Sequence, residues 1–155
     1  MRRTTLTITL AAILSAASAL AAAGNIFDAA LIGNAQEVAK FVIADPRLVH
    51  AKSELGSTPL HIAATASSPE MAKLLIAKGA NINARDNNGA TPLHLAAYTG
   101  KSEVAELLLN SGAIADAKDS KGATPLDYAR QVPSNETTSV LVLWLLKHPQ
   151  TTKKN

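Results

Sequence analysis

Apolar residues along the chain recur at the spacing of short amphipathic helices. In residues 71–75 and again in 104–108, apolar side chains stand at positions i, i+3 and i+4, which is the spacing of one buried helix face. A shorter segment that begins Thr-Pro-Leu precedes each run. Thr is a good N-cap, and Pro suits the first helical position, where its missing N–H is no loss. Polar turns containing Gly, at 86–89 and 119–122, separate the helices. The pattern predicts pairs of short helices, and therefore an all-α fold.

The Thr-Pro-Leu motif returns at a constant interval of 33 residues. Residues 58–64 read TPLHIAA, residues 91–97 read TPLHLAA, and residues 124–130 read TPLDYAR. A glycine stands two residues before each copy. A fixed interval of this length indicates a solenoid, in which each pair of helices buries its apolar face against its neighbours.

The chain resembles the ankyrin repeat family, whose units of about 33 residues carry a Thr-Pro-Leu-His-x-Ala motif. The resemblance covers about residues 25–148. It implies an ankyrin-repeat solenoid of about four stacked helix-turn-helix repeats with irregular capping repeats. The repeats are expected at about 25–57, 58–90, 91–123 and 124–148, in a domain spanning 24–150. Structural roles in capping, turns and inter-repeat hydrogen bonds are implied for Thr58, His61, Gly89, Thr91, His94, Gly122, Thr124 and Asp127.

The first and last repeats depart from the pattern, as capping repeats do. Residues 25–57 lack the Thr-Pro-Leu-His motif, and we expect one extra residue between their two helices. In the last copy, Asp127 replaces His and Arg130 replaces Ala. The seven apolar residues 140–146 would fit a strand or a helix by periodicity alone. Their place in the repeat favours a helix over about 135–147, with Trp144 covering the open end of the core.

The first 23 residues have the layout of a secretory signal peptide. Arg2 and Arg3 form a positive head, an apolar stretch follows, and the small-x-small triplets 19–21 and 21–23 suit signal peptidase. We therefore expect cleavage and export to the periplasm or beyond. The uncharged stretch 4–27 is also long enough to be an uncleaved membrane anchor, although its Ala, Thr and Ser favour lipid less than Leu, Ile and Phe do. At the other end, 151–155 is expected to be a disordered tail.

Composition narrows the function. The chain has no cysteine, which excludes a disulfide framework, a thiolate zinc site and a thiol nucleophile. Aromatic residues make up 3% of it, which argues against a base-stacking platform. Without the leader, 13 basic and 12 acidic residues remain, so the formal charge falls from +3 to +1. The basic balance is therefore mostly a targeting feature, and nucleic-acid binding is not expected.

No pattern for catalysis or metal binding is present in the sequence. His61 and His94 lie one repeat apart, too far to share a metal ion. Neither a Gly-x-Ser-x-Gly elbow, nor a phosphate-binding loop, nor a calcium loop occurs. We expect neither an enzyme nor a cofactor.

The resemblance implies that a partner binds the concave face, made of loop tips and the exposed side of each first helix. The candidates are positions that differ between copies: Glu54, Leu55, Thr65, Asn87, Asn88, Tyr98, Thr99, Ser120, Lys121, Arg130 and Gln131. Tyr98 and Arg130 stand out, because Tyr and Arg most often anchor interfaces. Lys52, Arg85 and Lys118 occupy one register position of the loop stems, which suggests a weakly positive ridge for an acidic partner.

These features predict a monomeric, non-catalytic interaction module of the periplasm that docks an unidentified protein partner on its concave face. Three roles stay open. The chain is an accessory or stabilising factor for a periplasmic enzyme such as a catalase, an immunity protein that neutralises a secreted toxin or effector, or a membrane-anchored scaffold. After cleavage of the leader, no membrane association is expected.

Overall fold

The computed structural model describes residues 25–66, 68–132 and 136–149, and every regular element in them is a helix. The helices form four pairs: α2 (Ile26–Leu31) with α3 (Ala35–Ala44), α4 (Pro59–Thr65) with α5 (Pro69–Ala77), α6 (Pro92–Tyr98) with α7 (Ser102–Asn110), and α8 (Pro125–Arg130) with α9 (Glu136–Lys147). A short 3-10 helix, η1 (Pro46–His50), follows α3. The prediction of an all-α solenoid with about four helix-turn-helix units is confirmed.

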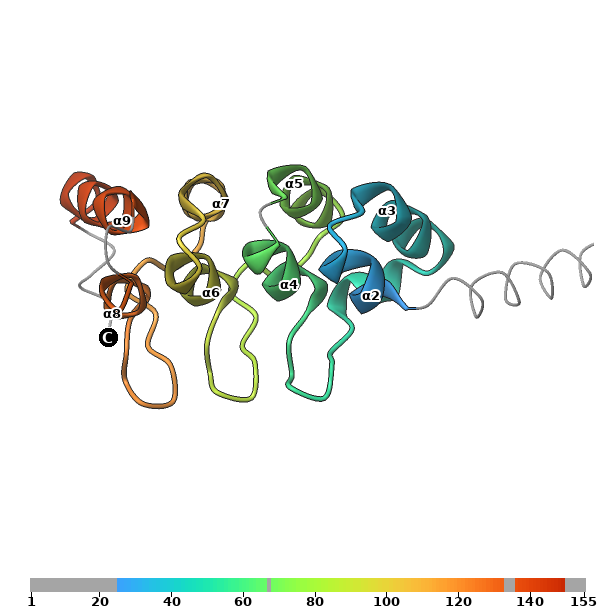
Figure 1. Cartoon of the computed structure of the whole chain (residues 1–155), viewed down its shortest axis with the longest axis horizontal. Helices are drawn as coiled ribbons and strands as arrows, with labels where there is room; N and C mark the ends of the chain where they lie inside the picture. Colours follow the sequence, from blue (N-terminus) through green and yellow to red (C-terminus); the bar gives the residue numbers. More distant parts are fainter. Residues whose placement is uncertain (1–24, 67, 133–135, 150–155) are drawn as a thin grey trace, which may run out of the picture.

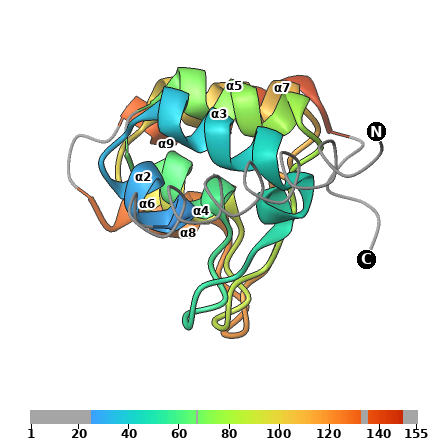
Figure 2. The ribbon, with the colours of Figure 1, turned by 90° about the vertical axis from the view of Figure 1, so that its right-hand side faces the viewer.

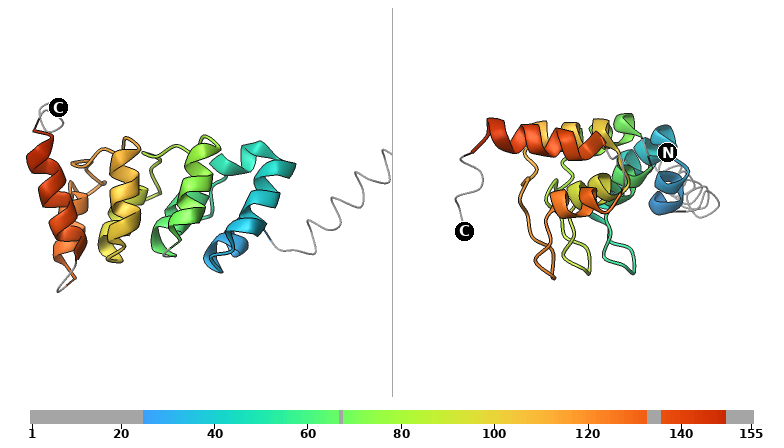
Figure 3. Two further views of the ribbon diagram at one scale, coloured as in Figure 1. Left: turned by 90° about the horizontal axis from the view of Figure 1, so that it is seen from above. Right: turned by 60° about the vertical axis from the view of Figure 1, so that its left-hand side comes forward.

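The helices stand in two rows (Figure 1). The inner helices α2, α4, α6 and α8 form one row, and the outer helices α3, α5, α7 and α9 form the other, seen side by side in Figure 3. Three long loops, here the first (51–57), second (84–90) and third (117–123), connect each pair to the next. Viewed along the stack, the loops almost superimpose and project from the inner row (Figure 2). Each repeat therefore contacts only its neighbours.

Alanine at the inner-helix positions lets the helices approach closely. Ala63 and Ala64 of α4, and Ala96 and Ala97 of α6, are fully buried, and interaxial distances depend on the side chains at the contact. Between the rows the largest fully buried apolar side chains are Leu60, Met71, Leu75, Leu93, Leu108 and Leu141. The core is therefore aliphatic, which accounts for the scarcity of aromatic residues.

Two histidines join each helix start to the loop that follows in the stack. The Nδ1 atom of His94 accepts the backbone N–H of Thr91 at 3.1 Å and lies 2.9 Å from the Thr91 hydroxyl. Because Nδ1 accepts, Nε2 carries the proton and donates to the carbonyl of Ala123 at 3.1 Å. His61 makes the same three contacts, reaching the carbonyl of Ala90.

The first repeat has no extra residue between its helices: three residues separate α2 from α3, as three separate α4 from α5, and α2 is one residue shorter than α4. Its N-caps Asn25 and Asn34 lie nine positions apart, whereas Thr58 and Ser68 lie ten apart. The expected extra residue was therefore wrong. The compensation comes later, because α3 has ten residues where α5 has nine, and Asp45 then caps η1 through the N–H of Arg47.

The last outer helix confirms the helical reading of its apolar run, but Trp144 lies elsewhere than expected. Trp144 is half-buried, stacks on His148 at 4.1 Å, and lines a groove beside Glu106 of α7. It therefore faces the preceding repeat. The exposed apolar residues of α9 are Val142, Leu143 and Leu146. The expected leader, the expected tail and the predicted helix start at residue 135 lie outside the described residues.

No helix in the described part of the chain combines the length and the hydropathy that crossing a membrane requires.

Candidate binding surface

The three loops are linked in a row by backbone hydrogen bonds. The N–H of Asn87 in the second loop donates to the carbonyl of Leu55 in the first at 3.0 Å. One repeat later, the N–H of Ser120 donates to the carbonyl of Asn88 at 2.9 Å. The loops therefore form one continuous surface, and they are not independent fingers.

Two glycines make this close approach possible. A Cβ atom at Gly56 would lie 2.8 Å from the backbone N of Asn87, and one at Gly89 would lie 2.8 Å from that of Ser120. Both residues also have a positive φ, 73° and 75°, which favours glycine. The equivalent residue of the third loop, Gly122, has a φ of 80° but no neighbour within 4 Å, because the described residues contain no fourth loop.

Several predicted contact residues of the loop tips hold the loop row together. The Asn87 side chain donates to the carbonyl of Glu54 at 2.9 Å, and the Ser120 hydroxyl donates to the carbonyl of Asn88 at 2.6 Å. Leu55 is 73% exposed, and the side chains of Glu54 and Lys121 are exposed with no bond to another described side chain. Sequence differences between the loop tips therefore have two causes: some of these side chains bond the neighbouring loop, and others are exposed to solvent.

Predicted positions on the inner helices divide in the same way. The hydroxyls of Thr65 and Thr99 donate back to carbonyls of their own helices, at 2.8 Å and 2.7 Å, so neither has a proton left to donate to a partner. The Gln131 amide lies 3.4 Å from the carbonyl of Asp127. Tyr98, in contrast, is 51% exposed at the end of α6.

Tyr98 belongs to an aromatic cluster that the sequence analysis missed. Its ring lies 6.3 Å from that of Tyr128 in an edge-to-face arrangement, and Tyr128 packs edge-on against His94 at 5.0 Å. Tyr128 occupies the position held by Ile62 and Leu95 in the preceding copies, all three being half-buried. In the sequence, the only indication of this cluster was a Tyr at a position where the other copies have an aliphatic residue, since the added hydroxyl needs a polar partner.

That polar contact is a hydrogen bond from the Tyr128 hydroxyl to the carboxylate of Asp119, at 2.8 Å. Burial, together with this bond, raises the pKa of Tyr128 to about 12. Burial opposes ionisation of Asp119, but donors from Tyr128, Ala123 and Lys121 outweigh it and hold the pKa of this carboxyl below its usual range. At neutral pH the ring is therefore a neutral phenol fixed by a carboxylate.

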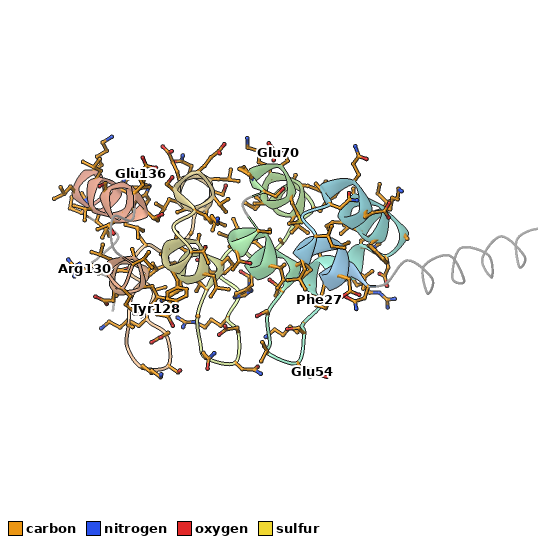
Figure 4. All side chains as sticks on the ribbon, viewed as in Figure 1. Phe27, Glu54, Glu70, Tyr128, Arg130 and Glu136 are labelled. Carbon is orange, nitrogen blue, oxygen red and sulfur yellow. The ribbon has the colours of Figure 1, made fainter. Side chains whose placement is uncertain are left out.

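Arg130 lies on a different surface from Tyr98. Its equivalents Ala64 and Ala97 are fully buried because another inner helix covers them, but no inner helix follows α8 in the part of the chain that the structure describes. Figure 4 shows Tyr128 on the side of α8 that faces α6, and Arg130 on the opposite side, over the end of the stack. The guanidinium is exposed and lies 3.7 Å from the Asp127 carboxylate.

The cations of the loop stems are partly used inside the molecule. Lys52 donates to the carbonyl of Arg85 at 3.3 Å, and Arg85 donates to the carbonyl of Lys118 at 2.5 Å. Lys118 has no following loop, and among the described residues nothing accepts from it. The predicted ridge is therefore a chain of inter-loop bonds that ends in a free lysine.

The described residues contain no group of three or more His, Asp or Glu side chains placed to hold a metal ion. Two shallow grooves, of about 190 and 230 Å³, lie between neighbouring outer helices, away from the loops.

The repeat geometry agrees with a comparison of sequences. A family model described as ankyrin repeats (3 copies) matches residues 26–119 and 86–155, most of the chain. The chain belongs to the ankyrin-repeat family. A search of curated proteins found no match. Ankyrin repeats are protein–protein interaction modules and are generally non-catalytic. In this ankyrin protein, Tyr98 and Tyr128 lie on the inner helices α6 and α8, the row from which the loops project.

Proposed function

We propose that this ankyrin-repeat chain is an exported, non-catalytic monomer that binds a protein partner on its inner surface. The supporting observation is the Tyr98–Tyr128 pair. Tyr98 is half exposed, and Tyr128 is held in place by Asp119 and His94. Large, rigid aromatic rings give contact area at a low cost in side-chain entropy, and Tyr is enriched among residues that dominate binding energy.

Replacing Tyr98 with alanine is expected to weaken partner binding by at least about 30-fold, because truncation of an anchoring residue costs about 2 kcal/mol or more. The measurement uses a photo-reactive phenylalanine analogue at position 98 to capture the partner in living cells, followed by titration of that partner with the Tyr98→Ala chain. Leu146→Ala is the matched control, because Leu146 is a large apolar residue, 72% exposed on outer helix α9. A partner that loses affinity for the Leu146 variant and not for the Tyr98 variant would place the interface on the outer row and refute the proposal.

The identity of the captured protein assigns the biological role. Capture of a periplasmic enzyme such as a catalase, with a rise in that enzyme's stability on binding, supports an accessory role. Capture of a secreted toxin that becomes inactive on binding supports an immunity role. The accessory role and the immunity role would use the same docking surface, so the fold does not distinguish them, and the identity of the captured protein does.

Export is proposed from the leader alone. The mature protein in the periplasmic fraction is expected to begin at Ala22 or Gly24, because both follow a small-x-small triplet. Intact mass spectrometry of that fraction measures this directly. A chain that keeps residues 1–23 and sediments with membranes would favour the anchored scaffold instead.

A further inference from the structure

In the described part of the chain the third loop has an unoccupied edge, which in the first and second loops binds the following loop. Leu55 and Asn88 each offer a carbonyl that accepts an N–H from the following loop. The equivalent carbonyl belongs to Lys121, and no described residue donates to it. The same holds three residues earlier in each loop. Lys52 and Arg85 donate to a carbonyl of the following loop, whereas no described residue accepts from Lys118.

This edge is also sterically open. Gly56 and Gly89 touch the backbone of the loop packed against them, and Gly122, in the same conformation, faces open space. The third loop therefore presents a backbone acceptor, a cationic donor and a glycine beside them, in the arrangement that already receives a polypeptide segment twice in this molecule.

Another repeat cannot occupy the edge. Where one repeat docks on another, His61 or His94 donates a hydrogen bond to a loop carbonyl of the following repeat. In the last copy Asp127 occupies the histidine position, and its carboxylate would repel such a carbonyl oxygen. A docked inner helix also needs the fully buried alanines Ala64 and Ala97, where Arg130 now stands. A second copy of the chain is excluded for the same two reasons. An extended segment would contact only the third loop, so neither Asp127 nor Arg130 prevents it from binding.

The charge of the edge indicates which segment fits. Lys118 and Lys121 are exposed on the third loop, where no described carboxylate pairs with them, whereas Arg130, at this end of the stack, is paired with Asp127 at 3.7 Å. The nearby Asp119 is 8% exposed, and its oxygens are already bonded to Tyr128, Ala123 and Lys121. The chain's own last residues carry Lys153 and Lys154, which have the same sign as the edge. An acidic segment from another protein is complementary.

We propose that the open edge of the third loop, formed by Lys118, Lys121 and Gly122, binds an extended acidic segment of the partner protein by main-chain hydrogen bonds. This rests on the proposed function and names the partner's chemistry. By the pattern of the docked loops, the segment donates one N–H to the Lys121 carbonyl. In the bound segment, the carbonyl two residues before this donor accepts from the Lys118 side chain. The third loop is the precedent: Ser120 donates its N–H to the second loop, and the carbonyl of Lys118, two residues before Ser120, accepts from Arg85. Addition of a strand to a free backbone edge is an established mode of peptide recognition.

The test uses the full chain as the cell processes it and three blocked octapeptides. The first alternates Asp and Val, the second alternates Lys and Val, and the third is the acidic peptide with an N-methyl group on every backbone nitrogen. Nuclear magnetic resonance titration follows the amide signals of the third loop. We expect the acidic peptide to shift them and to bind at least about tenfold more tightly than either of the others, because only it has both the charge and the free N–H groups.

Two charge-reversed variants supply the matched comparison. Lys118→Glu with Lys121→Glu is expected to weaken binding of the acidic peptide at least about tenfold. Lys73→Glu with Lys78→Glu, the same charge change on outer helix α5 and its C-cap, is expected to leave binding within about twofold. Both variants are expected to remain folded at the temperature of the titration, which thermal denaturation checks, since all four side chains are exposed and unbonded in the described structure.

Equal binding of the N-methylated peptide would overturn the strand-edge proposal and leave only a charge patch. Equal binding by the Lys118/Lys121 variant, or no shift at millimolar peptide, would overturn it as well. So would a concentration-dependent dimer of the wild type that this variant abolishes, because the occupant would then be a second copy. None of these results affects capture through Tyr98, so failure of this inference and failure of the proposed function can be told apart.

Discussion

Replacing Leu108 with alanine is expected to lower the free energy of unfolding by about 2–5 kcal/mol. Leu108 is fully buried in α7, in the third of four helix pairs, and α7 packs against α5, α6 and α9. The truncation removes apolar contacts in the core and leaves a cavity that rigid helices fill only in part. A domain of this size has a total stability of about 5–15 kcal/mol, so the loss is a large fraction of it.

Urea denaturation followed by circular dichroism measures this change. Leu146→Ala serves as the control, because Leu146 is 72% exposed and surface truncations usually change stability by less than about 0.5 kcal/mol. Leu93→Ala in α6, also fully buried, is expected to match the Leu108 variant. If the Leu108 variant lost less than about 1 kcal/mol, the helix register of the stack would be wrong.

The core could be predicted because the motif fixes it locally. Thr91 caps a helix, Pro92 starts it, and the two alanines that follow at 96 and 97 are small. Each of these facts can be read within ten residues, and the 33-residue interval carries them from one repeat to the next. The first repeat resisted this reasoning because its caps are Asn25 and Asn34, and the spacing between two isolated Asn residues carries no clear pattern.

The surface could be predicted only in part, because it depends on what stands beside each position. Arg130 matches the buried Ala97 in the alignment, but it is exposed because the stack ends there. Asn87 and Ser120 differ between copies as contact residues do, yet their side chains bond the neighbouring loop. Tyr128 stands at an aliphatic position, and only the fold brings its hydroxyl to Asp119. Sequence variation alone does not separate these causes.

Acidification is expected to destabilise the fold between about pH 7 and pH 5, because two neutral histidines are buried in it. Burial lowers the pKa of His61 and of His94 below the ordinary value of 6.5, and their hydrogen bonds to the carbonyls of Ala90 and Ala123 oppose this only in part. In the unfolded chain both rings titrate near 6.5. Between the folded and the unfolded pKa the unfolded state binds more protons, so stability falls as the pH decreases.

The size of the stability loss and the pH range in which it occurs identify the groups that cause it. Each titrating ring contributes at most about 1.4 kcal/mol per pH unit, so two rings contribute at most about 2.7 kcal/mol per unit. The pKa values of Asp119 and Asp127 are held below 3.8. The stability that these carboxylates contribute is present above that value and is lost only as the pH falls through their lowered pKa. Destabilisation between pH 7 and pH 5 therefore reports the histidines.

Urea denaturation at a series of pH values, on the wild type and on His61→Gln with His94→Gln, tests this assignment. We expect the double variant to be less stable at pH 7.5, because it loses the imidazole bridge between each Thr cap and the next loop, and to show little further loss down to pH 5. The exposed His50, changed to Gln as a control, should leave the wild-type slope intact. If the double variant kept the full slope, acid would act elsewhere in the molecule. If the slope disappears, the residues that join successive repeats are the same ones that make the solenoid sensitive to acid.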